Sequence, residues 1–400
     1  MRHLILIFLI FSSLFSKEIK IATYNVQNLF DLKQDGHEYP EYIASEKTNW
    51  NQKTLALKLA HIARVIRDLD ADVIALEEVE NLNVAVLLNR VLKDKKYPYI
   101  YTFFKKNKHV VGNVVFSRYK VAHKYSVDVE GFNRGIDVLK LYFDHEKLMI
   151  YINHWPAFKH GLKARNAYAK KLKSILNPND ESIIMGDFNA PYKIRQDQWG
   201  ASLVNTLGIG NRDKSLYDLW YELPPNMRYT YVYKRTKNTL DHIIISKNLL
   251  DHSKIEYKPK SFGVLRSNYL LDKYRYPKRW VVTKDFKNKG VGYSDHLPIY
   301  ATFQTPPYHQ PKIRTVSISY LKKMYNDLLP AILKNVTVIR VDAYSVLIGD
   351  GGERIKIYLP DETFKKGERY DILVQRIQNY KRSTEISLCK ILKTYKKGEK

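Results

Sequence analysis

The alternation of apolar and polar positions predicts a chain that mixes strands and helices. Short stretches that alternate or stay apolar are typical of strands, and they cover 17–26, 73–76, 111–117, 138–143, 147–154, 182–187, 239–246 and 297–303. Apolar residues recur every three or four positions in three stretches that predict helices, Gln52–Leu69, Val84–Val91 and Gly161–Leu176. Many strands with few helices favour an α+β sandwich of two sheets covered by helices over strict β-α-β alternation.

The pattern changes near Thr305. The segment TPPYHQP holds three prolines in seven residues, which indicates a linker over 306–311. Beyond it, the sequence predicts a helix over Ser317–Leu333 and four or five short strands separated by glycine-containing turns. A helix and five short strands within 312–400 are typical of a small β-barrel of the OB type. We therefore expect one large domain over 17–305 and a barrel domain after the linker.

Residues 1–16 have the pattern of a signal peptide. A basic start is followed by an apolar run over Leu4–Phe11 and then by small polar residues. This run is shorter than the ~20 residues that span a bilayer, so we expect export to the periplasm or the medium. Leu14 stands where a small residue is preferred before cleavage, which leaves an uncleaved anchor as an alternative. No later segment is apolar for long enough to span a membrane, so we expect no stable membrane insertion after signal removal.

Composition narrows the classes of protein. The chain has 67 Lys and Arg against 41 Asp and Glu, a formal charge of +26, which favours a polyanionic partner unless biased codon use alone explains the lysines. An apolar share of 44% excludes a mainly disordered chain. The single cysteine, Cys389, excludes an internal disulfide framework and lies in an alternating strand pattern, which predicts a buried thiol.

Polar residues that carry chemistry stand at the ends of several predicted strands. They are Asn25 in TYNVQNL, Glu77 and Glu78 in ALEEVEN, His154 in NHWP, Asp187 and Asn189 in GDFNA, Asp241 in LDHIII, and Asp295 and His296 in GYSDHLP. Each alone has an ordinary interpretation as a turn, a cap or a core histidine. Together, convergent carboxylates and amides provide oxygen ligands for Mg²⁺, and an Asp–His pair can deprotonate water. This set suits phosphodiester hydrolysis.

These motifs, in this order, resemble the endonuclease/exonuclease/phosphatase superfamily, which includes deoxyribonuclease I and the abasic-site endonucleases. The resemblance covers roughly residues 18–304 and implies a four-layered α/β sandwich with its active site at one rim of two facing sheets. It implies Mg²⁺, with Mn²⁺ as a substitute. The implied roles are metal binding by Asn25, Glu78 and Asp295, positioning of the nucleophile by Asp187 and Asn189, orientation of the catalytic His296 by Asp241, and phosphate contact by Arg134 and His154.

The sequence departs from the family pattern at His154. The family pairs this histidine with a glutamate on a neighbouring strand, and the segment here offers Val111 or Gly112 at that place. Glu77 stands where many members have glutamine. Phosphate binding is therefore the expected role of His154, rather than proton donation.

Three features favour nucleic acid as the substrate. The HWP form of the histidine segment resembles exported bacterial nucleases. The stretch over 266–296 interleaves basic and aromatic residues, as is typical of contact with single strands, and the residues expected to bind substrate are Arg275, Lys278, Arg279 and Trp280. Residues 306–400 carry 19 Lys and Arg against 10 Asp and Glu. A solvated loop and an ordinary lysine-rich surface are the structural alternatives.

The sequence therefore predicts a monomeric, exported, Mg²⁺-dependent nuclease that hydrolyses phosphodiester bonds in DNA, with RNA as a second substrate. Two alternatives stay open. One is a lipid phosphodiesterase of the sphingomyelinase kind, which would carry an exposed apolar hairpin. The other is a catalytically inactive protein that captures DNA.

Overall fold

The computed structural model describes most of the chain. The described residues are 16–104, 111–192, 207, 216–251, 253–306, 313–323, 331–358, 360, 362–380 and 383–395. The predicted signal peptide lies outside them except for Ser16, and the predicted linker lies outside them except for Pro306.

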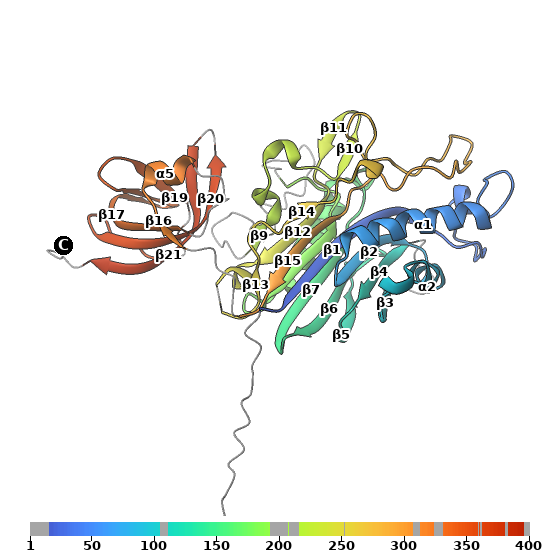
Figure 1. The fold of residues 1–400 in the computed structure, drawn as a ribbon, viewed down its shortest axis with the longest axis horizontal. Coiled ribbons are helices and arrows are strands. Elements are labelled where there is room, and N and C mark those ends of the chain that lie inside the picture. Colours follow the sequence, from blue (N-terminus) through green and yellow to red (C-terminus); the bar gives the residue numbers. More distant parts are fainter. Residues whose placement is uncertain are drawn as a thin grey trace, which may run out of the picture.

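Two facing sheets make up the larger part of the molecule (Figure 1). The first is ordered β13-β15-β1-β2-β4-β3 with β14 also paired to β15, and its strands are β1 (Glu18–Leu29), β2 (Val73–Val79), β3 (Tyr99–Phe103), β4 (Gly112–Ser117), β13 (Glu256–Tyr257), β14 (Gly263–Val264) and β15 (Ile299–Gln304). The second is ordered β5-β6-β7-β8-β12-β9, with β5 (Val121–Val127), β6 (Ile136–Phe143), β7 (Glu146–His154), β8 (Ser182–Asp187), β9 (Leu216–Asp218) and β12 (Asp241–Ser246). A separate hairpin joins β10 (Tyr231–Tyr233) to β11 (Thr236–Asn238).

Asparagine side chains cap the starts of two helices. The Asn51 side chain accepts a hydrogen bond from Thr54 N at the start of α1 (Gln52–Leu69), and the Asn81 side chain does the same for Val84 N at the start of α2 (Leu82–Val91). The bounds of α1 match the predicted helix. In Figure 1, α1 lies over the first sheet, and its buried apolar side chains belong to the same core as those of β1 and β2. Within the described residues, no helix is both long and apolar enough to cross a membrane.

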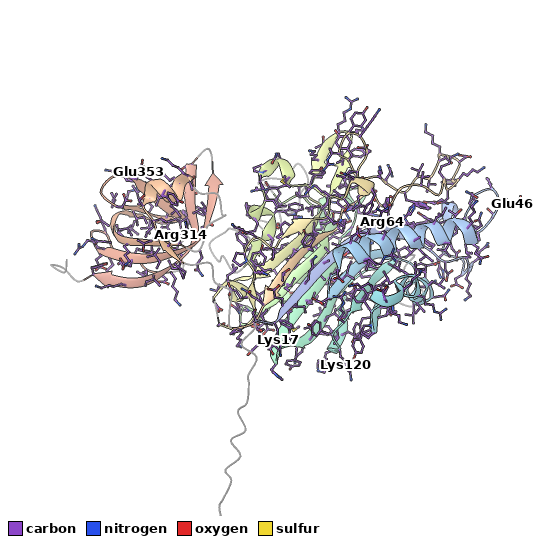
Figure 2. All side chains as sticks on the ribbon, viewed as in Figure 1. Lys17, Glu46, Arg64, Lys120, Arg314 and Glu353 are labelled. Carbon is purple, nitrogen blue, oxygen red and sulfur yellow. The ribbon has the colours of Figure 1, made fainter. Side chains whose placement is uncertain are left out.

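Successive side chains along the strands of the second sheet point to opposite faces, and each face packs into a different apolar core. On β8, Ile183 and Met185 point into the core between the sheets, whereas Ile184 packs on the outer side with α3 (Gly161–Ile175). Burying a side chain of this size contributes about 1.5–3 kcal/mol. Side chains from both sheets fill the space between the ribbons (Figure 2). The layers therefore run helix, sheet, sheet, helix, which confirms the predicted α/β sandwich.

The C-terminal residues build a second core. Its strands are β16 (Arg314–Thr315), β17 (Ala331–Asp342), β18 (Ser345–Gly349), β19 (Arg354–Tyr358), β20 (Arg369–Tyr380) and β21 (Ser383–Tyr395). They pair in the order β16-β17-β18-β19-β21-β20, and β20 also pairs with β17. The core these strands enclose contains only residues of this part of the chain, Cys389 among them, so the predicted burial of the thiol is confirmed.

The helix predicted over Ser317–Leu333 is wrong at its last three residues. The structure has α5 (Ile318–Lys323), residues 324–330 lie outside the described part, and the last three residues, 331–333, belong to β17, where they pair with β20. Cross-strand pairing and burial of Ala331 and Leu333 override the helical spacing in the sequence.

Gly186 of β8 pairs with Asn153 of β7, one residue before Asp187. Its φ is +124°, and a Cβ there would lie 2.0 Å from the carbonyl oxygen of Asn153. We expect Gly186→Ala to lower the free energy of unfolding by about 2–4 kcal/mol, because both the backbone conformation and the contact are unfavourable. Gly131→Ala is the matched control, since Gly131 also has a positive φ but has nothing within 4 Å of its Cβ position. Equal effects of the two substitutions in urea unfolding would contradict the prediction.

Candidate active site

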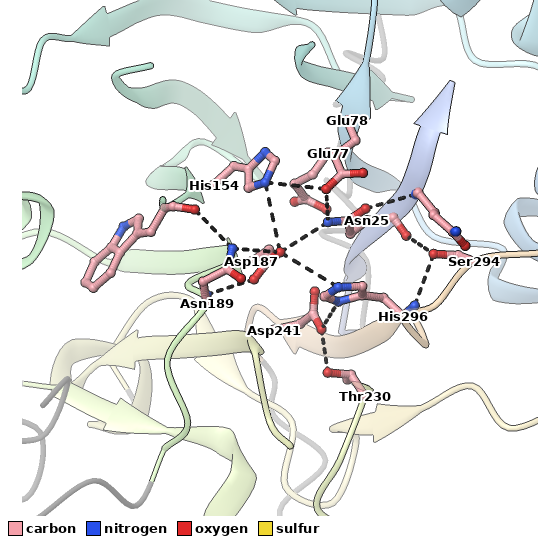
Figure 3. Close-up of polar contacts among 12 residues, drawn as sticks. Asn25, Glu77, Glu78, His154, Asp187, Asn189, Thr230, Asp241, Ser294 and His296 are labelled. Carbon is pink, nitrogen blue, oxygen red and sulfur yellow. Dashed lines mark hydrogen bonds and ion pairs between the residues drawn. The ribbon is translucent and has the colours of Figure 1, made fainter. Parts of the chain in front are cut away.

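Strand register brings the candidate residues to one rim of the sandwich. His154 ends β7 and Asp187 ends β8, and the two are partners in a parallel ladder. Because β12 runs antiparallel to β8, its first residue, Asp241, lies beside Asp187. On the facing sheet, Asn25 of β1 is the parallel partner of Glu77 of β2. Figure 3 shows side chains from both sheets pointing toward Asp187.

The Asn25 amide joins the two sheets at this rim. Its Nδ2 donates to Glu78 Oε1 at 2.9 Å and to Asp187 Oδ2 at 3.1 Å, while its Oδ1 accepts from Gln27 N at 2.9 Å (Figure 3). The amide oxygen is thus turned toward the backbone and the nitrogen toward the carboxylates. In this arrangement Asn25 positions Glu78 and Asp187, and the metal-binding role expected for it stays a prediction.

Asp187 is buried and closely held. Its Oδ1 accepts from Asn189 N at 2.8 Å, and its Oδ2 accepts from the Asn189 side chain at 3.2 Å. Asn189 has a φ of 47°, which turns its amide back toward both Asp187 and the Trp155 carbonyl. Burial raises the pKa of Asp187 to about 7, with the nearby His296 opposing the shift and the Asp241 carboxylate adding to it. Asp187 and Asn189 therefore lie together, as predicted.

Asp241 and His296 form the predicted pair. His296 Nδ1 lies 2.8 Å from Asp241 Oδ2, which also accepts from the Thr230 hydroxyl. Burial lowers the pKa of His296, but the Asp241 and Asp187 carboxylates outweigh burial and hold it well above its ordinary value. A carboxylate at Nδ1 fixes the tautomer. The free Nε2 consequently faces Asp187 Oδ2 at 3.9 Å, the spacing at which a water molecule can bridge two groups.

Two arrangements of carboxylates could hold a divalent cation. Glu78 accepts from Asn25 and from Asn28 N, and burial together with the nearby Asp295 carboxylate raises the pKa of Glu78. Glu78 and Asp295 are hard oxygen ligands of the kind that Mg²⁺ and Mn²⁺ prefer, and a bound cation would relieve the repulsion between the two carboxylates. Asp187, Asp241 and His296 also present ligand atoms within 4.8 Å of one another.

His154 faces Arg134 rather than an acid. Arg134 Nη1 lies 2.6 Å from His154 Nδ1, whereas His154 Nε2 lies 3.7 Å from Glu78 Oε1 and 4.0 Å from Asp187 Oδ2. Burial, followed by Arg134 and His296, lowers the pKa of His154 well below its ordinary value. A neutral imidazole beside a guanidinium is suited to binding an anionic oxygen and is a poor general acid. The geometry fits the phosphate-binding role expected for both residues.

The comparison with family models decides the relationship. The model described as "Endonuclease/Exonuclease/phosphatase family" matches residues 20–305. The chain belongs to the endonuclease/exonuclease/phosphatase family. Its members are generally hydrolases of phosphoester bonds, and the rim just described is the candidate active site.

Solved structures of this family resemble the chain at low sequence identity. Zebrafish (D. rerio) TDP2 complexed with a single-strand DNA product is 15% identical over 72% of this chain and 99% of that one, with a TM-score of 0.48. An endonuclease/exonuclease/phosphatase family protein from Leptotrichia buccalis is 16% identical over 71% and 99%, with a TM-score of 0.44. One from Bacteroides thetaiotaomicron is 14% identical over 73% and 100%, with a TM-score of 0.46. The comparison with curated proteins gave no match.

Several supporting residues of this endonuclease/exonuclease/phosphatase site were missed in the sequence. Thr230 donates to Asp241, and the Ser294 hydroxyl donates to Asn25 O at 2.7 Å while accepting from His296 N at 3.1 Å. His242 bridges Asp218 and the Ala190 carbonyl, which supports the segment carrying Asp187. Small hydroxyl residues next to acids are too common to stand out. The sequence did offer one indication, the LDH triplet 240–242. Asp241 and His242 are neighbours in a strand, so their side chains point to opposite faces of the sheet, and each polar side chain needs a hydrogen-bond partner on its own face.

The basic loop over 266–292 is anchored to the first sheet and to α1. The Gln27 side chain accepts from Trp280 N at 2.8 Å and donates to Trp280 O at 3.0 Å. The guanidinium of Arg64, labelled in Figure 2, lies over the Tyr269 ring at 3.8 Å. Arg275, Lys278 and Arg279 are exposed, as a substrate contact requires.

The role predicted for Trp280 is wrong. Its side chain is fully buried, donates from Nε1 to Asn288 at 2.8 Å and is covered by the Lys58 ammonium group at 4.9 Å. An enclosed indole has no face left on which a base could stack. The buried tryptophan instead holds the loop in place. An aromatic residue in a basic segment can pack in the core as readily as it can lie on the surface.

The Asp241 carboxylate is expected to control the protonation of His296. Asp241→Asn should lower the pKa of His296, observed by NMR titration of the histidine ring protons. A folded-state pKa above the unfolded value stabilises the protein fully below about pH 6.5, and this contribution is lost as the pH rises through the raised pKa. The loss of stability in Asp241→Asn should therefore be larger at pH 6 than at high pH.

Asp218→Asn is the control for this prediction, because Asp218 faces His242 instead. It should shift the His242 resonances and leave those of His296 in place. A His296 titration that is the same in wild type and Asp241→Asn would contradict the assignment.

Proposed function

We propose that this chain is a metal-dependent nuclease that hydrolyses phosphodiester bonds in DNA, with RNA as a second substrate. The observation that carries the proposal is the meeting of the Asp241–His296 pair with Asp187 at a rim where Arg134 and His154 offer hydrogen-bond donors to anionic oxygens. Activation of water beside a site for phosphate oxygens is what this reaction requires.

Each residue has a role that its contacts allow. In its neutral form, His296 takes a proton at Nε2 from a water molecule that also hydrogen-bonds Asp187, while Asp241 stabilises the imidazolium that forms. The water oxygen attacks phosphorus, the bond from phosphorus to the leaving oxygen breaks, and the leaving oxygen takes up a proton from solvent water to become the alcohol. Arg134 and His154 donate to the phosphate oxygens as charge develops on them, and Asn189 holds the Asp187 carboxylate in place. When bound by Glu78 and Asp295, Mg²⁺ or Mn²⁺ supplies positive charge next to the reacting phosphate.

The remaining expectations fit this function. The leader over 1–16 would export the enzyme to the periplasm or the medium, where extracellular nucleic acid is its substrate, and it would act as a monomer. The C-terminal strands pair in the order β17-β18-β19-β21-β20 and from β20 to β17, which supports an OB-like barrel. With an excess of lysine and arginine over acids, this barrel domain would hold nucleic acid near the active site.

One observation favours a lipid phosphodiesterase as the second candidate. Val282 and Asn288 form a bridge, and Thr283 and Lys287 pair inside it, so the segment 282–288 is a short hairpin. Phe286 near its tip is 46% exposed and lies between two lysines in the sequence, Lys284 and Lys287. An exposed aromatic ring flanked by basic side chains is suited to a membrane surface.

A digestion panel separates these functions. Purified protein with Mg²⁺ or Mn²⁺ should degrade circular and linear DNA, and EDTA should stop it. His296→Ala should lower kcat by about 10²–10⁴, the usual contribution of a general base, and Asp187→Asn should also inactivate the enzyme. Intact nucleic acid in all wild-type reactions would contradict the proposal.

The other outcomes of the panel identify the alternatives. Release of phosphocholine from sphingomyelin vesicles without DNA cleavage would establish the lipid phosphodiesterase. Tight DNA binding without cleavage, in any metal, would establish a DNA-capture protein.

A further inference from the structure

A groove adjoins the catalytic histidine on the side of the β10–β11 hairpin. It has a volume of about 630 Å³ and is bounded by this hairpin on one wall and by residues of the segment 272–292 on the other, with Asp295 at the end next to the catalytic centre. Figure 1 shows the hairpin at the same end of the sandwich as that segment. The groove therefore leads away from the point at which a scissile phosphate would lie.

The hairpin wall carries a row of aromatic rings. Tyr231 and Tyr233 are two residues apart on one strand, so they share a face, and both line the groove. The Tyr231 ring lies against the His296 ring, with 4.9 Å between their centres, and Tyr233 lies farther out with 58% of its surface exposed. The row thus begins at the catalytic histidine and continues outward along the groove.

The hairpin turn places two cations on the rim of the groove. Lys234 and Arg235 form the two-residue turn and have φ values of 45° and 68°. Such a turn favours Asn-Gly, because both central residues take the left-handed conformation. A Lys-Arg pair in this conformation is less stable, and strained backbone of this kind is often retained for function.

The opposite wall is basic and firmly held. Lys278 and Arg279 are exposed and line the groove together with Tyr276. Their positions are fixed because the Gln27 side chain pairs with the backbone of the next residue, Trp280. In the described part of the chain, none of the four cations at the groove forms an ion pair. The Asp272 carboxylate, which also lines the groove, accepts hydrogen bonds from the backbone N–H groups of Tyr274 and Tyr276.

We propose that this groove binds a single-stranded segment of nucleic acid, and that the enzyme therefore prefers unpaired strands. The inference rests on the proposed nuclease function and names its substrate class. Unpaired bases can stack on Tyr231 and Tyr233 while the four cations contact phosphates. The volume is in the range of sites for drug-sized ligands, about 300–1,000 Å³, which corresponds to roughly one or two nucleotides. A duplex is two strands wide and has its base faces covered, so it gains little from such a groove.

Binding and cleavage by groove variants test the proposal. Tyr233→Ala and the double substitution Lys234→Ser with Arg235→Ser remove one ring and the two turn cations. Affinity for a fluorescent single-stranded 12-nucleotide DNA is measured by anisotropy in EDTA, and KM and kcat are measured with Mg²⁺ on single-stranded DNA, duplex DNA and bis(p-nitrophenyl) phosphate. Circular dichroism verifies that each variant is folded.

The expected results separate the groove from the chemistry. The wild type should bind and cleave single strands better than the duplex. Tyr233→Ala should raise KM and Kd for single strands roughly 5- to 150-fold, the factor equivalent to 1–3 kcal/mol for one stacked base. The double variant should reduce the slope of log affinity against log salt by about 0.7 for each lost phosphate contact. Hydrolysis of bis(p-nitrophenyl) phosphate should be unchanged.

Matched controls are available outside the groove. Tyr274 is 63% exposed and does not line the groove, so Tyr274→Ala should leave binding unchanged. Lys96 and Lys120 are exposed outside the groove and provide the charge control when both are changed to serine. Groove variants that bind single strands as the wild type does, or a wild type that prefers duplex, would overturn the inference. A wild type that hydrolyses no phosphodiester but binds single strands through the groove would overturn the proposed function and leave the groove assignment standing.

Discussion

The active site depends on one contact between the two sheets, the amide of Asn25. It donates to Glu78 on its own sheet and to Asp187 on the facing sheet, so it fixes the distance between the candidate metal-binding carboxylate and the carboxylate that positions water. The Ser294 hydroxyl holds the Asn25 backbone and, through the N–H of His296, the catalytic histidine as well. A shift of one sheet against the other would therefore disturb every group in the site at once.

This contact also brings carboxylates close together at the rim, where their negative charges repel one another. Burial together with neighbouring acids raises the pKa values of Glu78 and Asp187, and burial raises that of Glu77. Asp241 is paired with His296, and Arg134 lies beside His154 at the same rim, which offsets part of this negative charge. Glu78 and Asp295 are the carboxylates at which we propose that a divalent ion binds. The basic residues that surround these carboxylates would also attract a polyanionic substrate.

The sequence predicted those features that depend on neighbouring residues along the chain. The spacing of apolar residues defined α1 over Gln52–Leu69, and the motifs with Asp187, Asp241 and His296 identified groups that strand register does bring together. Features that depend on packing could not be read in this way. The burial of Trp280, the direction of the Asn25 amide and the groove beside Tyr231 each require knowing which segments meet in space. Residues 331–333 continue a helical spacing, yet pairing with β20 makes them a strand.

Hydrolysis of a phosphodiester in ¹⁸O-labelled water tests the central claim most directly. If His296 activates water to attack phosphorus, mass spectrometry of a single turnover should find one ¹⁸O in the phosphate monoester product and none in the released alcohol. His296→Ala should slow the incorporation without redirecting it. Label in the alcohol, or label incorporated at the wild-type rate in His296→Ala, would contradict the account.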